Sequence, residues 1–343
     1  MNQIKESKLI ALGYLGLGKH ADDCLLPSIL HIPEAYLHTI VSRNPKKLAD
    51  FAKRYKVKYT SNDWLDLIHS DEIQGIIVSG PPQLHFEVAK KALANNKHIF
   101  VEKPPTDTIE HLGELIELEK KSKSKVFIGY NFTYSEAFNN LIKPLSSNIK
   151  LVRMKFVSGK PLSKGYFSNV FDYSLYSMLV HPLHTSLSLL KDKEITNIQS
   201  FSRVHSDPRF SMELIIETKD TTIIIDWGNY SNRFEFDFEV IDENNCVGRM
   251  HDLFQYEYFN TDNSFDIPFA KGKQRTVFDY SLRDGGYNRN GYLPELTHWI
   301  NSFSEVNTPL FKNSFKDSLQ LYSIIEKVKS QNPNLYNLTP LED

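Results

Sequence analysis

A glycine-rich turn after the first apolar run constrains the fold of this chain more than any other feature. Leu9–Leu15 has the pattern of a buried strand, and Gly16, Gly18 and Ala21 follow it at the spacing G-x-G-x-x-A. Glycine permits a tight turn and lets a phosphate approach backbone N–H groups, and alanine is accepted at the third position. We therefore expect a strand, turn and helix that can cradle a pyrophosphate. An ordinary structural turn is the alternative interpretation.

Strand and helix patterns alternate along residues 1–130, which is typical of a parallel sheet with helices on its faces. Each expected strand is a continuous apolar run, as in strands that are buried on both faces. The expected strands are Leu9–Leu15, Leu37–Ser42, Ile73–Ser79, His98–Glu102 and Val126–Tyr130. We assign residues 1–130 to a doubly wound, nucleotide-binding α/β domain.

The pattern changes in residues 131–343. Val152, Met154 and Phe156 alternate with charged residues, and the apolar residues of 234–240 do the same. Period-two alternation predicts strands with one buried and one wetter face, which are usually antiparallel. Helices are expected over Leu293–Phe303 and Phe315–Lys329. We therefore expect a second, α+β domain on a large, open, mostly antiparallel sheet, with the option that the final helices pack back on the first domain.

The composition limits the partners of the chain. Its 343 residues carry 40 Lys and Arg against 42 Asp and Glu, and this balance argues against nucleic-acid binding. The N-terminal segment has no signal-peptide pattern, and its apolar run is too short to span a membrane. Cys24 and Cys246 have no motif spacing, which suits a reducing cytoplasm. Because an open sheet face needs a partner, we expect a homodimer or homotetramer formed through the C-terminal sheet.

The residues after the second expected strand favour one nicotinamide cofactor. An NAD(H) site usually has Asp or Glu there, which accepts hydrogen bonds from the ribose hydroxyls. Here Ser42 ends the strand and Arg43 follows it, and both can bind the 2′-phosphate of NADP(H). We predict NADP(H), with NAD(H) less favoured. The alternative is a solvated Arg43 and dual specificity.

A lysine follows the fourth expected strand, in the sequence Glu102-Lys103-Pro104-Pro105. The prolines stiffen the turn, so that the lysine projects from a fixed point at the carboxyl edge of the sheet, where ligands of doubly wound folds bind. Its ammonium can stabilise the charge on a carbonyl oxygen as hydride arrives. The alternative is a surface lysine in a turn.

Several motifs occur together in a fixed order. They are Gly16-x-Gly18-x-x-Ala21, Pro81-Pro82-Gln83-Leu84-His85, His98-Ile99-Phe100-Val101-Glu102-Lys103-Pro104 and Gly129-Tyr130-Asn131. They resemble the glucose–fructose oxidoreductase/inositol dehydrogenase (Gfo/Idh/MocA) family across residues 9–135, and more thinly through His181 and Gly291–Leu296. The resemblance implies a Rossmann domain joined to an open-sheet domain. It also implies an oxidoreductase that acts on sugars, polyols or sugar nucleotides with a nicotinamide cofactor.

The resemblance further implies the site residues. Lys103 and His181 are the catalytic candidates, with His181 as proton shuttle because a histidine ordinarily titrates near neutral pH. A histidine that only binds substrate or packs in its helix is the alternative. The expected cofactor contacts are Gly16, Gly18, Lys19, His20, Ala21, Ser42, Arg43, Gly80, Pro81, His85, Glu102, Lys103 and Asn131. The expected substrate contacts are Lys103, Tyr176, Ser177, His181 and His184. His85 either lines the cofactor cleft or caps the proline-rich turn.

The substrate half departs from the family pattern. Ser177 stands where the family has an aspartate, four residues before His181. Lys103 then takes a larger share of the proton chemistry, or a nearby acid or phenol substitutes. The substitutes considered are Asp172, Tyr173 and Tyr176, and the other departures are Gly80, Leu179 and His184. No metal is expected, because His181 and His184 have no third ligand at metal spacing. Arg283 and Arg289 would bind a substrate that carries phosphate.

Together these features predict an NADP(H)-dependent oxidoreductase that transfers hydride to or from a carbonyl or secondary alcohol of a sugar, sugar nucleotide or related polyol. Two alternatives stay open, an imine reductase of similar fold and a catalytically silent NADP-binding regulator. The intact Glu102-Lys103-Pro104 favours the sugar enzyme, and Ser177 keeps the regulator open.

Overall fold

The computed structural model describes residues 9–159, 164–191, 193–253, 255–267, 270–278, 290–304 and 313–339. As far as they are described, these residues form two compact units. The first unit consists of residues 1–131 and 291–319, and the second of residues 132–290 and 320–343. The sequence assigned 131–343 to the second domain, with the option that the final helices pack back. The contacts group 291–319 with the first unit.

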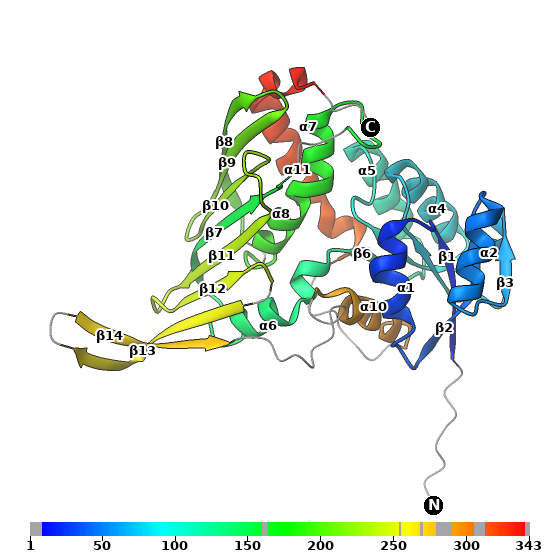
Figure 1. The fold of residues 1–343 in the computed structure, drawn as a ribbon, viewed down its shortest axis with the longest axis horizontal. Helices are drawn as coiled ribbons and strands as arrows, with labels where there is room; N and C mark the ends of the chain where they lie inside the picture. Colours follow the sequence, from blue (N-terminus) through cyan, green and yellow to red (C-terminus); the bar gives the residue numbers. More distant parts are fainter. Residues whose placement is uncertain are drawn as a thin grey trace, which may run out of the picture. The chain divides into compact units, whose positions relative to one another are not determined.

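A six-stranded parallel sheet forms the centre of the first unit, in the order β3-β2-β1-β4-β5-β6 (Figure 1). Its strands are β1 (Ile10–Leu15), β2 (Ala35–Val41), β3 (Tyr59–Ser61), β4 (Gly75–Val78), β5 (His98–Glu102) and β6 (Val126–Gly129). The strand order reverses between β1 and β4. The loops after these two strands therefore meet at the carboxyl edge, the usual place of a ligand in this kind of sheet. The predicted doubly wound α/β fold is confirmed.

Helices pack around this sheet, and local chemistry sets where some of them begin. They are η1 (Ala21–Leu25, a π-helical turn), α1 (Leu26–Ile29), α2 (Pro45–Arg54), α3 (Leu65–His69), α4 (Pro82–Ala94), α5 (Ile109–Glu119) and α10 (Tyr292–Asn301). Asn44 accepts the N–H of Lys47 and caps α2, and Thr108 accepts the N–H of His111 and caps α5. Both caps supply a partner for an N–H group that lacks one within the helix.

Helix α10 docks on the sheet of the first unit through a tryptophan. The Trp299 ring is fully buried, with its centroid 5.7 Å from that of Phe100 and 4.9 Å from that of Phe303. Its indole N–H donates to the carbonyl of Lys125, just before β6, at 3.3 Å. This docking holds the first turn of α10, which begins with Tyr292, within the first unit.

An eight-stranded sheet forms the centre of the second unit, in the order β14-β13-β12-β11-β7-β10-β9-β8. Its strands are β7 (Ile149–Val157), β8 (Ile195–Ser206), β9 (Arg209–Thr218), β10 (Thr222–Gly228), β11 (Glu235–Asp242), β12 (Val247–His251), β13 (Gln255–Ile267) and β14 (Ala270–Phe278). Neighbouring strands are antiparallel, except that β7 and β10 run parallel. The predicted large, mostly antiparallel sheet is confirmed.

Helices lie along one face of this second sheet (Figure 1). They are α6 (Glu136–Ile142), α7 (Val170–Tyr173), η3 (Ser174–Leu179), α8 (Val180–Leu187) and most of α11 (Phe315–Gln331), with the short turns η2 (Asn131–Tyr134) and η4 (Pro333–Asn337). Along β11, Phe236 and Phe238 are buried while Glu235 and Glu239 are partly exposed, so the strand has one apolar and one polar face. In the part of the chain that the structure describes, no helix combines the length and apolarity needed to cross a membrane.

Replacing Trp299 by alanine should lower the free energy of unfolding by about 3–5 kcal/mol, because it removes a fully buried indole and leaves a cavity. Urea denaturation followed by circular dichroism measures this loss. Leu30→Ala is the matched control, since Leu30 is 58% exposed and its truncation should cost no more than about 0.5 kcal/mol. Equal losses in the two variants would contradict the docking role of Trp299.

Candidate functional site

The turn after β1 is locked against the end of β4. Gly16 has a φ of +106°, and a Cβ there would lie 1.9 Å from the carbonyl oxygen of Ser79, so only glycine fits. The Ser79 hydroxyl donates to the carbonyl of Gly16 at 3.0 Å and accepts from the phenol of Tyr14 at 2.7 Å. Direct hydrogen bonds therefore join the ends of the two central strands.

The same turn offers space and donors to a phosphate. A Cβ at Gly18 would meet no heavy atom of the described chain within 4 Å. The N–H of Asp22 bonds to the carbonyl of Gly18 at 3.1 Å, so the N–H groups of the preceding turn have no acceptor inside the helix. This geometry suits a pyrophosphate, and the residues present fit the predicted dinucleotide cofactor. The Lys19 ammonium, from a side chain 89% exposed, pairs with Asp23 at 2.6 Å.

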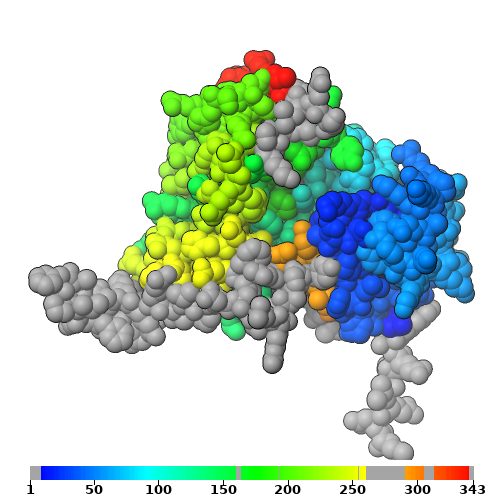
Figure 2. Space-filling model, viewed as in Figure 1, coloured from blue at the N-terminus to red at the C-terminus, as the bar shows by residue number. Residues whose placement is uncertain are grey.

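Ser42 and Arg43 follow the end of β2, the strand next to β1 in the sheet. The Ser42 hydroxyl accepts the N–H of Asn44 at 3.2 Å, and Arg43 is exposed. The blue stretch that contains β2 and α2 forms part of the visible surface in Figure 2. Residues 42–44 contain no carboxylate, so nothing in this turn would repel a 2′-phosphate.

His85 joins the loops after β4 and β5. It is buried, and its Nε2 accepts the N–H of Gly80 at 2.8 Å. Its Nδ1 therefore carries the proton and donates to the carbonyl of Pro104 at 2.9 Å. Burial lowers the pKa of His85 to about 4, so the ring is neutral at physiological pH. These contacts support the interpretation of His85 as a structural residue that fixes the proline-rich turns.

Lys103 follows the last residue of β5, and its peptide bond to Pro104 is cis. The side chain of Glu102 is buried, and its Oε2 accepts the backbone N–H of Lys103 at 3.2 Å. Burial lowers the pKa of Lys103, although the carboxylate of Glu102 acts in the opposite direction. Lys103 thus comes from a fixed strand end and loses its proton more easily than an exposed lysine does.

His20 pairs with Glu102 across the site. Its Nε2 lies 3.2 Å from Oε1 of Glu102, and its ring contacts that of Tyr292 edge-on, with centroids 5.4 Å apart. Burial alone would lower the pKa of His20, but the Glu102 carboxylate and a hydrogen bond with Cys24 raise it to about 10. His20 is therefore an imidazolium at neutral pH. The sequence predicted His20 as a cofactor contact but gave no signal of this ion pair.

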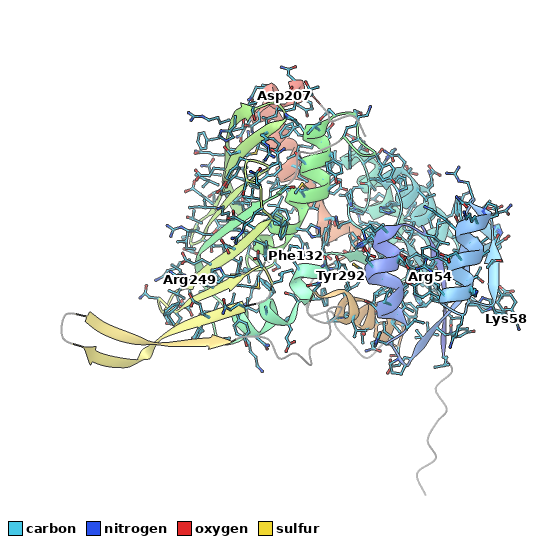
Figure 3. The ribbon with its side chains drawn as sticks, viewed as in Figure 1. Arg54, Lys58, Phe132, Asp207, Arg249 and Tyr292 are labelled. Atoms are coloured by element: carbon cyan, nitrogen blue, oxygen red, sulfur yellow. The ribbon has the colours of Figure 1, made fainter. Side chains whose placement is uncertain are left out.

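Glu295, on the first turn of α10, is a buried carboxyl that the sequence analysis missed. It is fully buried, and neither carboxyl oxygen has a hydrogen-bond partner among the described residues. Burial, followed by the charge of Glu102, raises the pKa of Glu295 well above its usual value, so it is neutral at physiological pH. Tyr292, which is labelled in Figure 3, lies three residues before Glu295 in the sequence. The sequence signal that could have revealed this buried carboxyl was a single carboxylate on the face of the helix that is expected to be apolar.

In the second unit, the ring of His181 stacks on Phe132, with centroids 4.4 Å apart and planes 19° apart. His184 lies one turn further along α8, and Ser177 lies in η3. Both are half-buried. Phe132, labelled in Figure 3, precedes α6, so the stack joins two segments far apart in the sequence.

Tyr176 and Asp172 belong to a separate polar network. The Tyr176 hydroxyl donates to Oε1 of Glu326 at 2.7 Å, and Lys329 lies 3.0 Å from that oxygen and 3.5 Å from Asp172. Burial and the Glu326 carboxylate raise the pKa of Tyr176, and burial raises that of Tyr173. Both shifts are opposite to the one that a proton-donating tyrosine needs.

The remaining sequence candidates are dispersed. Asn131 is buried at the end of the first segment of the first unit. Arg283 and Arg289 lie outside the described residues. Among the residues that are described, no three His, Cys, Asp or Glu side chains gather in a way that could hold a metal ion.

Residues 10–130 match the Gfo/Idh/MocA family, described as an oxidoreductase family with an NAD-binding Rossmann fold. The chain is 28% identical over 127 residues to dTDP-3,4-didehydro-2,6-dideoxy-alpha-D-glucose 3-reductase of Saccharopolyspora spinosa. That match covers 37% of this chain and 38% of the relative. The chain thus matches under two fifths of the length of its first curated relatives.

Solved structures resemble nearly the whole chain. The dehydrogenase from Chromobacterium violaceum has a TM-score of 0.85 and 22% identity, and the match covers 94% of this chain and 95% of that one. Levoglucosan dehydrogenase in complex with NADH and L-sorbose has a TM-score of 0.80 and 15% identity, with 96% and 98% covered. At these identities the likeness shows a shared fold.

The stability of Glu295→Gln relative to that of the wild type should increase as the pH rises. In the wild type, the unfolded chain releases this proton above about pH 4.3, whereas the folded state keeps it, so stability falls with rising pH. The variant lacks this loss. Thermal unfolding between pH 4 and pH 9 measures the difference, with the exposed Glu110→Gln on α5 as matched control. Parallel curves for E295Q and wild type would show that Glu295 is ionised in the fold.

Proposed function

The chain belongs, through residues 10–130, to the Gfo/Idh/MocA family of oxidoreductases with an NAD-binding Rossmann fold, and on this basis we propose that it is an NADP(H)-dependent oxidoreductase. Its substrate in this proposal is a carbonyl or secondary alcohol of a sugar, sugar nucleotide or related polyol. The observation that carries the proposal is the turn at Gly16 and Gly18. It is locked on Ser79, open to a phosphate, and joined through His20 to the residue before Lys103.

The cofactor choice rests on the end of β2. Ser42 and Arg43 supply a hydroxyl and an exposed guanidinium, the groups that bind a phosphate monoester, and no carboxylate stands beside them. The structure of levoglucosan dehydrogenase holds NADH, so the preference of this chain rests on its own residues. When bound, the nicotinamide would supply or accept the hydride.

Lys103 is the group that we assign to the substrate oxygen. Its ammonium donates a hydrogen bond to that oxygen and stabilises the negative charge that develops there. Because burial lowers the pKa of Lys103, the ammonium also transfers its proton more readily. The cis peptide bond to Pro104 and the buried Glu102 flank it on either side in the chain.

His181 is the second catalytic residue of the proposal, as a group that binds the substrate and exchanges a proton with it. The stack on Phe132 restricts the orientation of its ring. Ser177 supplies a hydroxyl where the family has a carboxylate, so Lys103 carries the larger share of the proton chemistry. Because the Tyr176 hydroxyl already donates a hydrogen bond to Glu326, Tyr176 would contribute its ring to substrate binding rather than a proton. His184 and Asn131 stay predicted contacts.

The carbohydrate substrate class is proposed from similarity. The relative from Saccharopolyspora spinosa is named as a reductase of a dTDP-linked deoxysugar, and one solved structure of the same fold holds L-sorbose. The first name denotes a keto-sugar linked to a nucleotide, and the second a ketose. A keto-sugar or a nucleotide-linked keto-sugar is therefore the first substrate class to test.

We also propose self-association through the second sheet and a cytoplasmic location. The polar face of that sheet carries neighbouring charges of both signs, which suit a second copy of the same face. Glu239 lies 3.4 Å from Arg153 and 2.7 Å from Arg249, which Figure 3 labels on the side of the sheet away from the helices. The cytoplasm is proposed because the two cysteines of the chain form no disulfide.

Titration with NADPH and with NADH, followed by cofactor fluorescence, should give tighter binding of NADPH. Arg43→Ala should weaken NADPH binding about tenfold or more and leave NADH binding unchanged, because a hydrogen bond to a charged group contributes about 1.5–3 kcal/mol. Tighter binding of NADH by the wild type, or an equal effect of Arg43→Ala on both cofactors, would overturn the NADP(H) preference.

Gly18→Val is the matching variant for the phosphate turn. A side chain there meets no protein atom near its Cβ, so the fold should persist while the pyrophosphate is blocked and both titrations are lost. If Gly18→Val bound the cofactors like the wild type, the pyrophosphate would lie elsewhere. Binding of neither cofactor by the wild type would overturn the proposed function.

Lys103→Met should reduce turnover of keto-sugars with NADPH by about a hundredfold or more and spare NADPH binding, since it removes the proton donor but keeps an unbranched side chain. Lys58→Met, on the exposed segment before β3, is the matched control and should turn over like the wild type. Turnover retained by Lys103→Met would contradict the role of the lysine. A wild type that binds NADPH but reduces no carbonyl would favour the silent regulator.

A further inference from the structure

The carboxylate of Glu102 contacts both the ring of His20 and the backbone N–H of Lys103. His20 comes from the helix start after β1, and Lys103 is the next residue in the chain. The His20 Nε2 lies 3.2 Å from Oε1, while Oε2 accepts the backbone N–H of Lys103 at 3.2 Å. One oxygen of the carboxylate thus forms an ion pair with His20, and the other accepts a hydrogen bond from the segment that carries the lysine.

Side chains of two helices hold His20 in this position. The Tyr292 ring of α10 contacts it edge-on, with centroids 5.4 Å apart, and Cys24 of η1 helps to raise its pKa. The His20 side chain is still 41% exposed, whereas that of Glu102 is 6% exposed. The His20 imidazolium therefore pairs with a buried carboxylate while its own side chain stays partly exposed.

Four other titratable groups of the first unit carry no charge at neutral pH. Burial raises the pKa values of Glu295, Tyr292 and Tyr14, and it lowers that of His85, so all four are neutral. Although burial alone would raise the pKa of Glu102, His20 and Lys103 lower it and keep the carboxylate ionised. The charge of Glu102 therefore acts on both His20 and Lys103.

We propose that His20 is a positioning residue for the proton transfer from Lys103: its imidazolium competes with the Lys103 ammonium for the single charge of Glu102, and thereby makes that ammonium a better proton donor. The proposal rests on the proposed function for the identity of the reaction. The competition itself concerns only residues of this chain.

The proton balance shows why this competition matters. As hydride reaches the carbonyl carbon, a C–H bond forms and the π electrons move to the oxygen. An N–H bond of Lys103 breaks as the alcohol O–H forms, and a neutral amine remains. Without His20, that transfer would leave the buried Glu102 carboxylate with no cation, which is costly in a low-dielectric site. With His20 protonated, Glu102 keeps a cationic partner before and after the step.

The acidity of Lys103 can be measured without cofactor or substrate. Only the neutral amine reacts with an N-hydroxysuccinimide ester, so the acylation rate of Lys103 against pH, followed by peptide mass spectrometry, gives its midpoint. His20→Gln should raise that midpoint by about one pH unit. His31→Gln, an exposed histidine after α1, is the matched control and should leave it unchanged. An unchanged or lower midpoint in His20→Gln would overturn the proposal.

Glu102→Gln tests the competition by removing the carboxylate charge. It tests the proposal even if His20→Gln fails to fold. Removing the shared charge should lower the Lys103 midpoint, and an unchanged midpoint would overturn the proposal. In the double variant the effect of His20→Gln should vanish, because no carboxylate is left to compete for. A full His20 effect in that background would also overturn it, since His20 would then act on Lys103 directly.

Turnover separates this proposal from the proposed function. If the protein reduces a keto-sugar, His20→Gln should move the alkaline limb of its kcat/KM profile upward by the same interval as the acylation midpoint, and an unmoved limb would overturn the role in catalysis. If the midpoints move as expected but no carbonyl is reduced, the charge competition stands and the proposed function fails.

Discussion

The close contact between Gly16 and Ser79 fixes the carboxyl edge of the first sheet, and the rest of the candidate site depends on it. Only a residue without a Cβ can bring the turn after β1 so near to the end of β4. The hydrogen bonds from Tyr14 through Ser79 to Gly16 hold that approach. Because the turn is fixed, the helix that follows starts at a defined place, and the His20 ring before it pairs with Glu102 at the end of β5.

Charge is the second constraint on this edge. Burial discourages ionisation of every group there, yet the contact with His20 keeps Glu102 charged, while Glu295 without such a partner stays neutral. Of these two buried carboxyl groups, Glu102 is therefore ionised and Glu295 is protonated. Lys103, next to the anion but desolvated, has a pKa below that of an exposed lysine and therefore gives up its proton more readily.

Sequence patterns predicted the elements that depend on residues close together in the chain. Five of the six strands of the first sheet are long apolar runs and could be placed from sequence, whereas β3 is a three-residue edge strand with exposed Tyr59 and Thr60 and has no such signal. The Gly16–Gly18 turn and Lys103 became candidates because motif spacing marks them. The His20–Glu102 pair and the burial of Glu295 depend on contacts between distant segments, which no single-sequence pattern records. The raised pKa of Tyr176 likewise arises from burial and from Glu326, which lies far along the chain.

The most direct test of this account is a crystal structure of the protein with NADPH. The account predicts that the pyrophosphate lies against the N–H groups after Gly18 and that the 2′-phosphate contacts Ser42 and Arg43. It also predicts that the nicotinamide lies within reach of Lys103, with His20 still paired to Glu102. A pyrophosphate bound away from the Gly16–Gly18 turn, or a nicotinamide remote from Lys103, would contradict it.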